Sequence, residues 1–321
     1  MLVQHFLEYY ARNTPELPCL TQHGHTTTFG EVNTLSNRLA NGLLSLGVEK
    51  GQRVAVLGEN SLQHLLLIMA AGKIGAVTVS LNYRLAPAEL NFIIRDSETR
   101  VLLALEGMQD TMGVLSAELP NETTVISQSG DGLVLDNWLE EQKEEHPGVP
   151  VSPHDAFLQL YTSGTTGNPK GVVISHFNIL TLSMMNNTAS PNRANAGMAG
   201  IICAPLFHIG GAGSIVFGIF TGMETLLHRA FDPVKVVEDI ENHDVCNVFM
   251  VPAMIMAVMQ LPDIEKRDFS KLSQIFYGAS PISETVLRRA VEVFECDFIQ
   301  MYGMTETTGT VVNLTADDHR R

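Results

Sequence analysis

The stretch YTSGTTGNPKG, residues 161–171, combines four small hydroxyl side chains with three glycines, a proline and a lysine. Apolar segments flank it, AFLQL before and VVIS after, and both are typical of buried strands. A connection between two paired strands usually needs only about two to five residues. This connection is longer than a turn requires, which indicates that the loop has a function of its own.

Segments typical of strands alternate with segments typical of helices on both sides of this loop. Thr28 and Glu31 form a capping-box pattern that predicts a helix through about Leu46. Further helices are predicted over residues 61–76, over 87–96 and from about 177 onward. The predicted strands are RVAVLG, VTVSLN, VLLAL, AFLQLY, GVVIS, GIICA, VFMVP, QIFYG and DFIQMY.

Strands that alternate with helices of this length imply parallel pairing, with right-handed crossovers and helices on both faces of the sheet. In DNWLEEQKEEHPGVPVSPHD, residues 136–155, a charged helix gives way to a segment with three prolines, which is typical of a linker. The sequence therefore predicts an α/β protein with two parallel-sheet subdomains flanked by helices. The first is predicted over residues 1–150 and the second over 156–321.

Composition narrows the class of protein. The 321 residues are 45% apolar and 17% charged, which is globular composition, and length of this order favours more than one compact unit. The formal net charge is −15 and no basic run occurs, so nucleic-acid binding is not expected. The four cysteines show no CxxC spacing, which favours reduced thiols, and the N-terminal segment lacks a basic n-region. A cytoplasmic protein is predicted.

Two uncharged runs are long enough to raise the question of a membrane span. The run over 194–223 is interrupted by Pro205, by His208 and by a glycine cluster, so a buried strand, a loop and a helix explain it better. The run over 245–262 is broken by Pro252 and receives the same interpretation.

The hydroxyl-rich loop has the chemistry of a polyphosphate site. Its glycines let backbone N–H groups turn inward, its hydroxyls add donors, and Lys170 adds a positive charge. It is not a Walker A loop, because the chain's one Gly-Lys pair ends at Lys73 and is followed by isoleucine. From the residues alone, a polar surface hairpin stays open as the alternative.

The same loop resembles the phosphate-loop signature of the adenylate-forming acyl-CoA synthetases. Three further stretches match that superfamily in order. PLFHIGG (205–211) resembles the segment beside the acyl pocket, YGASPIS (277–283) resembles the strand and turn around the adenine, and QMYGMTETTG (300–309) resembles the adenylate-binding motif. The resemblance runs over essentially the whole chain and implies the N-terminal large domain of the acyl-CoA synthetase fold.

The resemblance implies an ATP-dependent ligase that activates a fatty or aryl carboxylate as acyl-AMP and passes it to coenzyme A, with Mg²⁺ as the metal. A domain that loads a carrier protein, and a nucleotide-binding module without turnover, are the alternatives. The implied partners are the small carboxylate, ATP and coenzyme A. A peripheral membrane contact and a homodimer are kept as hypotheses.

The resemblance also implies residue roles. Thr305 would bond the α-phosphate, Glu306 would hold Mg²⁺, Lys170 would meet the β- and γ-phosphates, and Tyr302 would stack on the adenine. For Tyr302 the alternative is a core residue at a strand end. His208 would orient the carboxylate, although a lone buried histidine is more often a packed one. The remaining implied nucleotide contacts are Thr162, Ser163, Gly164, Thr165, Thr166, Gly167, Gly278, Ala279, Ser280, Gln300, Met301 and Gly303.

The chain departs from the family pattern in two respects. Met301 and Tyr277 stand where many relatives have glycine, so both are expected to change the size of the nucleotide or acyl channel. The chain also ends just after the adenylate motif, whereas relatives continue through a β-barrel and a mobile C-terminal domain with a catalytic lysine. We therefore expect a truncated N-terminal portion with weak turnover and an exposed apolar surface.

Overall fold

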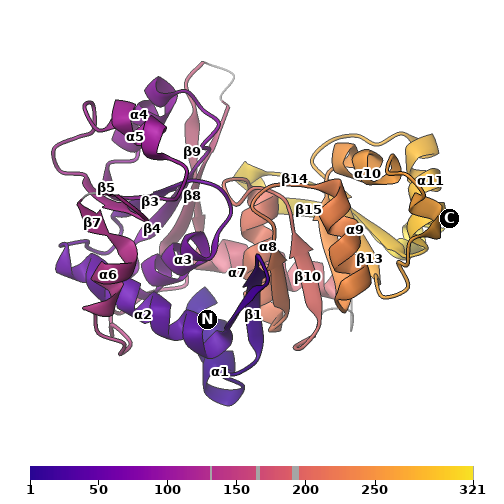
Figure 1. Cartoon of the computed structure of the whole chain (residues 1–321), viewed down its shortest axis with the longest axis horizontal. Coiled ribbons are helices and arrows are strands. Elements are labelled where there is room, and N and C mark those ends of the chain that lie inside the picture. Colours follow the sequence, from indigo (N-terminus) through magenta and orange to yellow (C-terminus); the bar gives the residue numbers. More distant parts are fainter. Residues whose placement is uncertain (131, 164–166, 190–194, 321) are drawn as a thin grey trace.

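The computed structural model describes residues 1–130, 132–163, 167–189 and 195–320 of the chain. Two sheets form two lobes that lie side by side, with α7 and α8 between them (Figure 1). Within the described residues the helices are α1 Val3–Asn13, α2 Phe29–Ser45, α3 Leu62–Ile74, α4 Pro87–Asp96, α5 Gln109–Leu115, α6 Leu135–Glu140, α7 His176–Ala189, α8 Ile209–Thr221, α9 Pro233–Asn242, α10 Pro252–Met259, α11 Glu284–Phe294 and α12 Ala316–His319.

The first sheet has the strand order β7-β6-β5-β3-β4-β8-β9 among the described residues. Its strands pair in parallel except for the antiparallel hairpin β8–β9, which carries the hydroxyl-rich loop at its tip. The strands are β3 Arg53–Leu57, β4 Val77–Leu81, β5 Thr99–Ala104, β6 Thr124–Ser127, β7 Leu133–Val134, β8 Ala156–Thr162 and β9 Lys170–Ser175.

The second sheet has the order β15-β14-β13-β12-β10-β11-β1-β2. Its central strands are parallel, and an antiparallel neighbour closes each edge. The strands are β1 Pro18–Gln22, β2 His25–Thr28, β10 Ala199–Ile202, β11 Glu224–Leu227, β12 Val245–Met250, β13 Gln274–Gly278, β14 Asp297–Met304 and β15 Gly309–Leu314.

The α/β class and the predicted strands are confirmed. The capping box at the start of α2 is present, since Glu31 N–H donates to Thr28 Oγ1 and Thr28 N–H donates to the Glu31 carboxylate. The uncharged run over 194–223 contains β10 and α8, as expected. No helix in the described part of the chain is long and apolar enough to cross a membrane.

The predicted division at 150/156 does not coincide with the division between the sheets. β8 and β9 follow residue 155 but pair with β4 in the first sheet, whereas β1 and β2 pair with β11 in the second. Order along the chain does not fix spatial order, because each crossover can place the next strand on either side of the previous one. As a division into independently folding units, the two ranges stay a prediction.

The predicted charged helix after residue 136 is short and ends at Glu140. The chain beyond it is held to α2 by hydrogen bonds to its backbone instead. Asn37 Nδ2 donates to Glu144 O at 2.8 Å, and Asn41 Nδ2 donates to the carbonyl oxygens of Lys143 and Glu145.

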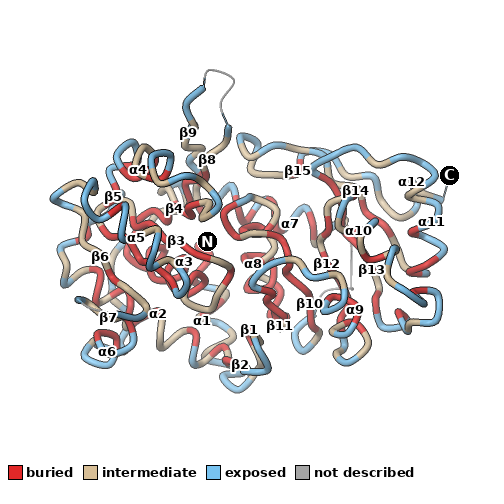
Figure 2. Tube along the Cα trace, turned by 45° about the horizontal axis from the view of Figure 1, so that its top comes forward, coloured by how far each residue is buried: buried red, intermediate tan, exposed pale blue. Residues whose placement is uncertain are grey.

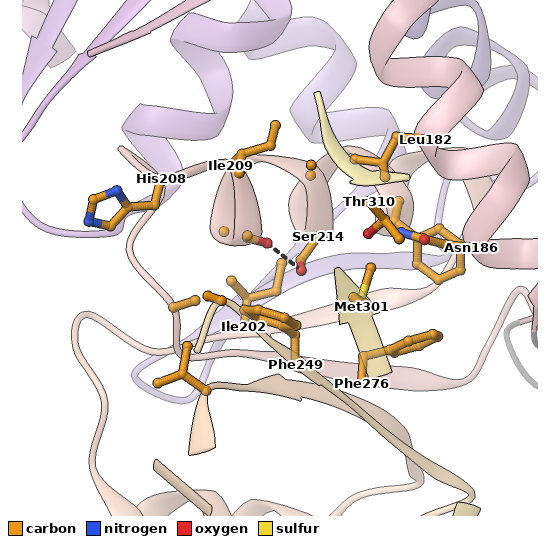
Figure 3. Close-up of a pocket in the computed structure, with 18 of the residues that line it drawn as sticks. Leu182, Asn186, Ile202, His208, Ile209, Ser214, Phe249, Phe276, Met301 and Thr310 are labelled. Atoms are coloured by element: carbon orange, nitrogen blue, oxygen red, sulfur yellow. Dashed lines mark hydrogen bonds between the residues drawn. The ribbon is translucent and has the colours of Figure 1, made fainter. Parts of the chain in front are cut away.

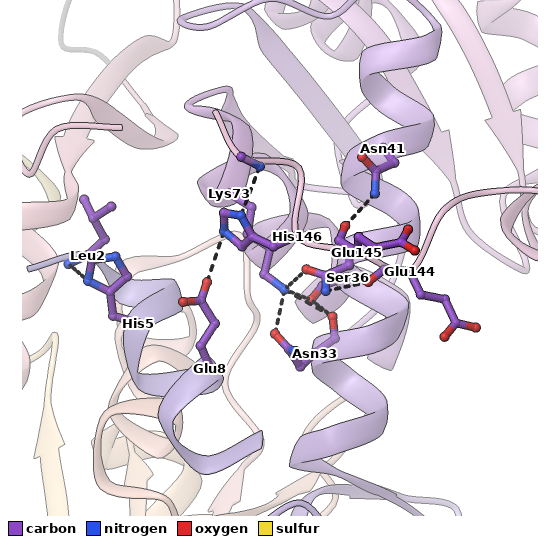
Figure 4. A network of polar contacts seen from close by, with 12 residues as sticks. Leu2, His5, Glu8, Asn33, Ser36, Asn41, Lys73, Glu144, Glu145 and His146 are labelled. Carbon is purple, nitrogen blue, oxygen red and sulfur yellow. Dashed lines mark hydrogen bonds and ion pairs between the residues drawn. The ribbon is translucent and has the colours of Figure 1, made fainter. Parts of the chain in front are cut away.

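A fully buried lysine lies beside this contact (Figure 4). Lys73, on α3, is 0% exposed. Its ammonium donates to two oxygens of Asn33 at 3.1 and 2.8 Å, to Ser36 Oγ at 2.8 Å and to Asn37 Oδ1 at 2.6 Å. These bonds tie α3 to α2 inside the first lobe.

One large apolar cluster joins the two lobes. It includes Val54 and Leu158 of the first sheet together with Ile202 and Leu227 of the second, and Ile215 of α8 packs into it. The exposed residues gather at the far edges, around the β8–β9 tip and along β15 (Figure 2). Large exposed apolar side chains on β14 and β15 are Tyr302, Met304, Val311, Val312 and Leu314.

Candidate functional site

A pocket of about 470 Å³ opens between α7 and α8 on one side and the strands of the second sheet on the other (Figure 3). This volume lies in the range of small-molecule sites, about 300–1,000 Å³. Most of the lining is apolar. Among the described residues, those predicted from the sequence that line it are His208, Ala279, Met301, Gly303 and Thr305.

The two nucleotide motifs meet because their strands are neighbours. β13 and β14 pair in parallel with Gly278 opposite Met301, so YGASPIS and QMYGMTETTG end at the same edge of the sheet. A β-carbon at Gly278 would lie 2.2 Å from Met301 O, and one at Gly303 would lie within 1.6 Å of Gly309 O. Only glycine permits this approach of the backbones.

The hydroxyl-rich loop and the adenylate motif come together across the lobes. Thr305 and Glu306 lie on η2 (Thr305–Thr307), a 3₁₀ turn after β14, and Glu306 is exposed. Thr162 Oγ1, at the end of β8, donates to Glu306 Oε1 at 3.4 Å, although 144 residues separate the two. β9 also contacts this turn.

The described part of the loop leaves its charged and hydroxyl groups accessible. Ser163, Gly167 and Lys170 are exposed, and Lys170 makes no ion pair with any described residue. Gly167 has φ +98°, a conformation that L side chains rarely adopt. The predicted contacts Gly164, Thr165 and Thr166 lie outside the described residues.

His208 is the N-cap residue of α8 and is exposed at the edge of the pocket, across from Asn186 (Figure 3). It is therefore not a packed core histidine. Atoms around the ring exclude part of its solvent and lower the pKa of His208, and the positive charge of Arg84 lowers it further. Arg84 itself lies over the rings of Tyr83 and Phe207 at 5.4 and 5.8 Å. The imidazole is accordingly neutral at neutral pH.

Met301 and Tyr277, which stand where many relatives have glycine, lie in different places. Met301 lines the pocket, where its side chain fills space that a glycine would leave open. The expectation that Tyr277 reaches the channel is wrong, because its side chain is buried in the core of the second lobe and its hydroxyl lies 2.8 Å from His319 Nε2. The alternation of the strand sends this side chain to the opposite face from Phe276, which does line the pocket.

The predicted adenine contacts lie at the edge of the second sheet. Tyr302 is 69% exposed, so a core role for it is excluded. Ala279 and Ser280 are exposed after β13, and Ala279 has φ +66°. Gln300 pairs with Tyr277 on the neighbouring strand. These positions leave an aromatic face and a backbone turn open to a planar ligand.

A residue that the sequence did not reveal positions the segment before His208. Asn60 is buried between the lobes, and its Nδ2 donates to Ala204 O and to His228 O, both at 3.0 Å. Its Oδ1 accepts from Leu206 N–H at 2.8 Å. Through these three bonds the carboxamide holds the loop that leads into α8 and also the residue that follows β11.

Other pocket residues were also missed. Leu182 and Asn186 come from α7, and Phe276 comes from β13. In the methionine-rich stretch of residues 248–259 only some side chains face the pocket, and others are core. One sequence signal could have identified Asn186, namely a polar residue one helical turn after Leu182 on an apolar helix face.

The carboxylates of the described residues fit a Mg²⁺ site in which the nucleotide supplies most of the ligands. No group of three or more His, Cys, Asp or Glu side chains that could hold a metal occurs in residues 1–130, 132–163, 167–189 and 195–320. Mg²⁺ in nucleotide enzymes usually needs only one or two carboxylates, with substrate phosphates and water as further ligands. Exposed Glu306, beside the Thr162 hydroxyl, fits this arrangement.

Comparisons with known proteins show the family of the chain. A family model described as AMP-binding enzyme matches residues 7–321. The chain is 32% identical over 316 residues to the fatty acid–acyl-carrier-protein ligase ScoC of Streptomyces coeruleorubidus, covering 97% of this chain and 60% of that protein. It is 34% identical over 305 residues to a feruloyl-CoA synthase of an Amycolatopsis species, covering 95% of this chain and 59% of that protein.

A solved structure shows the same fold. The inhibitor-bound N-terminal domain of FACL13 from Mycobacterium tuberculosis superposes with a TM-score of 0.92 at 27% identity, over 100% of this chain and 80% of that one. The chain thus spans about 60% of the length of the curated relatives it matches and most of this isolated N-terminal domain.

Proposed function

Because the chain belongs to the AMP-binding enzyme family, we propose that it carries the nucleotide and acyl sites of an ATP-dependent ligase that joins a carboxylic acid to coenzyme A. One observation carries the proposal. The contact from Thr162 to Glu306 brings the phosphate loop to the adenylate motif, and that motif also lines an apolar pocket. A polyphosphate and an acyl group can therefore be held side by side.

In the proposed first step, a carboxylate oxygen attacks the α-phosphorus of ATP in line with the leaving pyrophosphate. A new P–O bond forms to the carboxylate as the bond to the bridging oxygen breaks, which gives acyl-AMP. Such a transfer needs charge neutralisation and alignment more than covalent help. Thr305 would donate to the α-phosphate and Lys170 would meet the outer phosphates. Mg²⁺, held by Glu306 and the nucleotide, would neutralise phosphate charge.

His208 would orient the substrate carboxylate at the edge of the pocket. Since its imidazole is neutral at neutral pH, it can donate one hydrogen bond without fixing the carboxylate as an ion pair. Asn60 would keep the preceding loop in place for this task.

In the proposed second step, a thiolate attacks the acyl carbon and AMP leaves with the electron pair of the broken C–O bond. Coenzyme A is the proposed acceptor, as the name of the feruloyl-CoA synthase suggests. A carrier-protein thiol is the second candidate, because a relative of similar identity is named for that acceptor.

The test is a panel of carboxylic acids with ATP and Mg²⁺, on this chain and on a version extended to the length of the relatives. Acyl-AMP detected by mass spectrometry, with matching pyrophosphate release, supports the first step. Adding either coenzyme A or a phosphopantetheinylated carrier protein then identifies the acceptor. Absence of acyl-AMP with every acid in both versions would contradict the proposal.

Lys170→Ala is expected to weaken ATP binding about tenfold, the scale of one hydrogen bond to a charged group. AMP binding should change little, since Lys170 is proposed to meet only the outer phosphates. Isothermal titration with both nucleotides measures the difference, and Lys143→Ala, an exposed lysine in the first lobe, is the control. An equal loss for ATP and AMP would point to a structural role for Lys170.

A further inference from the structure

The wall of the pocket across from His208 contains a buried polar group without a partner. Asn186, on α7, is 8% exposed and lines the pocket. Its carboxamide oxygen is buried and has no hydrogen-bond partner among the described residues. Leaving a buried polar group unpaired is energetically costly, so a ligand or a bound water is expected to pair with it.

Nearby residues add to this polar wall. Thr310, on β15, is buried and lines the pocket, and its side chain makes no hydrogen bond in the described part of the chain. α7 contacts β15, and Figure 3 shows Asn186 and Thr310 on the same side of the pocket. A hydroxyl and a carboxamide thus line the end of a pocket whose other walls, such as Leu182 and Phe276, are apolar.

A third polar side chain on the pocket wall makes only weak hydrogen bonds. Asn247, on β12, is buried, and among the described residues its Nδ2 donates only to the sulfur atoms of Met223 and Cys246, at 3.6 and 3.3 Å. Sulfur is a weak acceptor. A pocket built only for a hydrocarbon chain would not be expected to place several poorly satisfied polar groups on its wall.

We propose that this pocket selects carboxylic acids that carry a hydroxyl group at the end far from the carboxylate, and that Asn186 recognises this hydroxyl. The inference rests on the proposed function, in which the carboxylate lies near His208. A hydroxyl both donates and accepts, so it can pair with the Asn186 oxygen and the Thr310 hydroxyl together. The surrounding apolar walls enclose the body of the acid, and Met301 limits its width.

The test uses acyl-sulfamoyl adenosines, stable mimics of acyl-AMP, because binding them needs no turnover. Two matched pairs are titrated against the chain, made from cinnamic and 4-hydroxycinnamic acids and from octanoic and 8-hydroxyoctanoic acids. The hydroxylated member of at least one pair is expected to bind about tenfold more tightly. The pair that shows the preference also tells whether the body of the acid is aromatic or alkyl.

Asn186→Leu removes the carboxamide at nearly constant shape. It should weaken binding of the preferred hydroxylated mimic about tenfold and tighten binding of its plain partner, so that the preference reverses. Asn187→Leu, the next residue on the same helix and no part of the pocket wall, should keep the original preference.

The outcomes separate the two proposals. If no mimic binds, the proposed adenylate site fails and this inference fails with it. If mimics bind but neither hydroxylated member is preferred, the acyl site stands and the inference is overturned, because water then satisfies Asn186. A preference that survives in Asn186→Leu would also overturn the role of Asn186.

Discussion

Replacing Glu306 by glutamine is expected to abolish the Mg²⁺ dependence of ATP binding and to weaken binding in Mg²⁺ about a hundredfold. Removing a group that only hydrogen-bonds to a metal ligand typically lowers metal affinity about 10–100-fold. Because Glu306 is proposed as a ligand itself, its loss is expected to fall at the upper end of that range. The amide keeps the shape of the side chain but loses the charge that a hard cation requires. ATP titrations with Mg²⁺ and with EDTA give the comparison.

The contact with Thr162 makes a structural control necessary. Glutamine can still accept the hydrogen bond from Thr162 Oγ1, so Glu306→Gln should leave the thermal unfolding midpoint unchanged. Glu145→Gln, an exposed carboxylate in the first lobe, should leave the Mg²⁺ dependence intact. Unchanged Mg²⁺ dependence in Glu306→Gln would mean that another carboxylate holds the ion.

The sequence predicted the elements of the fold well because each signal is local. The capping pair Thr28 and Glu31 determines where a helix begins, and an apolar run such as RVAVLG favours a strand at its own position. Membership of the strands in the two sheets was not predictable in this way. The β8–β9 hairpin joins the first sheet through its pairing with β4, more than seventy residues earlier in the chain, and no local pattern records that contact.

The same distinction between local signals and long-range contacts applies to the candidate site. Motif resemblance proposed roles for Thr305, Glu306 and His208. Thr305 and His208 line the pocket, and Glu306 lies beside Thr162; their roles stay predictions. Asn60 and Asn186 were missed because their importance arises from what the fold places around them. From the sequence alone, an asparagine is most simply interpreted as a polar surface residue. The structure shows that the Asn186 oxygen is buried without a hydrogen-bond partner among the described residues, and that Asn60 bonds to the backbone of the other lobe.

Lys73→Met is expected to lower the free energy of unfolding by at least about 3 kcal/mol. Methionine fills a similar volume but leaves the acceptors of Asn33, Ser36 and Asn37 without their donor, and each buried unpaired group costs about 1–3 kcal/mol. Urea unfolding monitored by circular dichroism measures the loss. Lys266→Met, which removes an exposed ion pair with Asp263, should cost less than about 1 kcal/mol.

The effect of Lys73→Met should also depend on pH, and the direction follows from burial. Burial lowers the pKa of Lys73 to about 7 in the folded chain, against 10.5 for an unperturbed lysine, while the negative charge of Glu8 opposes the shift. Between these values the unfolded chain binds more protons than the folded chain, so the stability contributed by this group increases as the pH rises from about 7 to 10. The variant lacks the group, and its deficit relative to the natural chain should therefore be smallest near pH 6 and widen toward pH 9. A deficit that stays constant over this range would mean that the four oxygen contacts keep Lys73 charged in the folded state despite its burial.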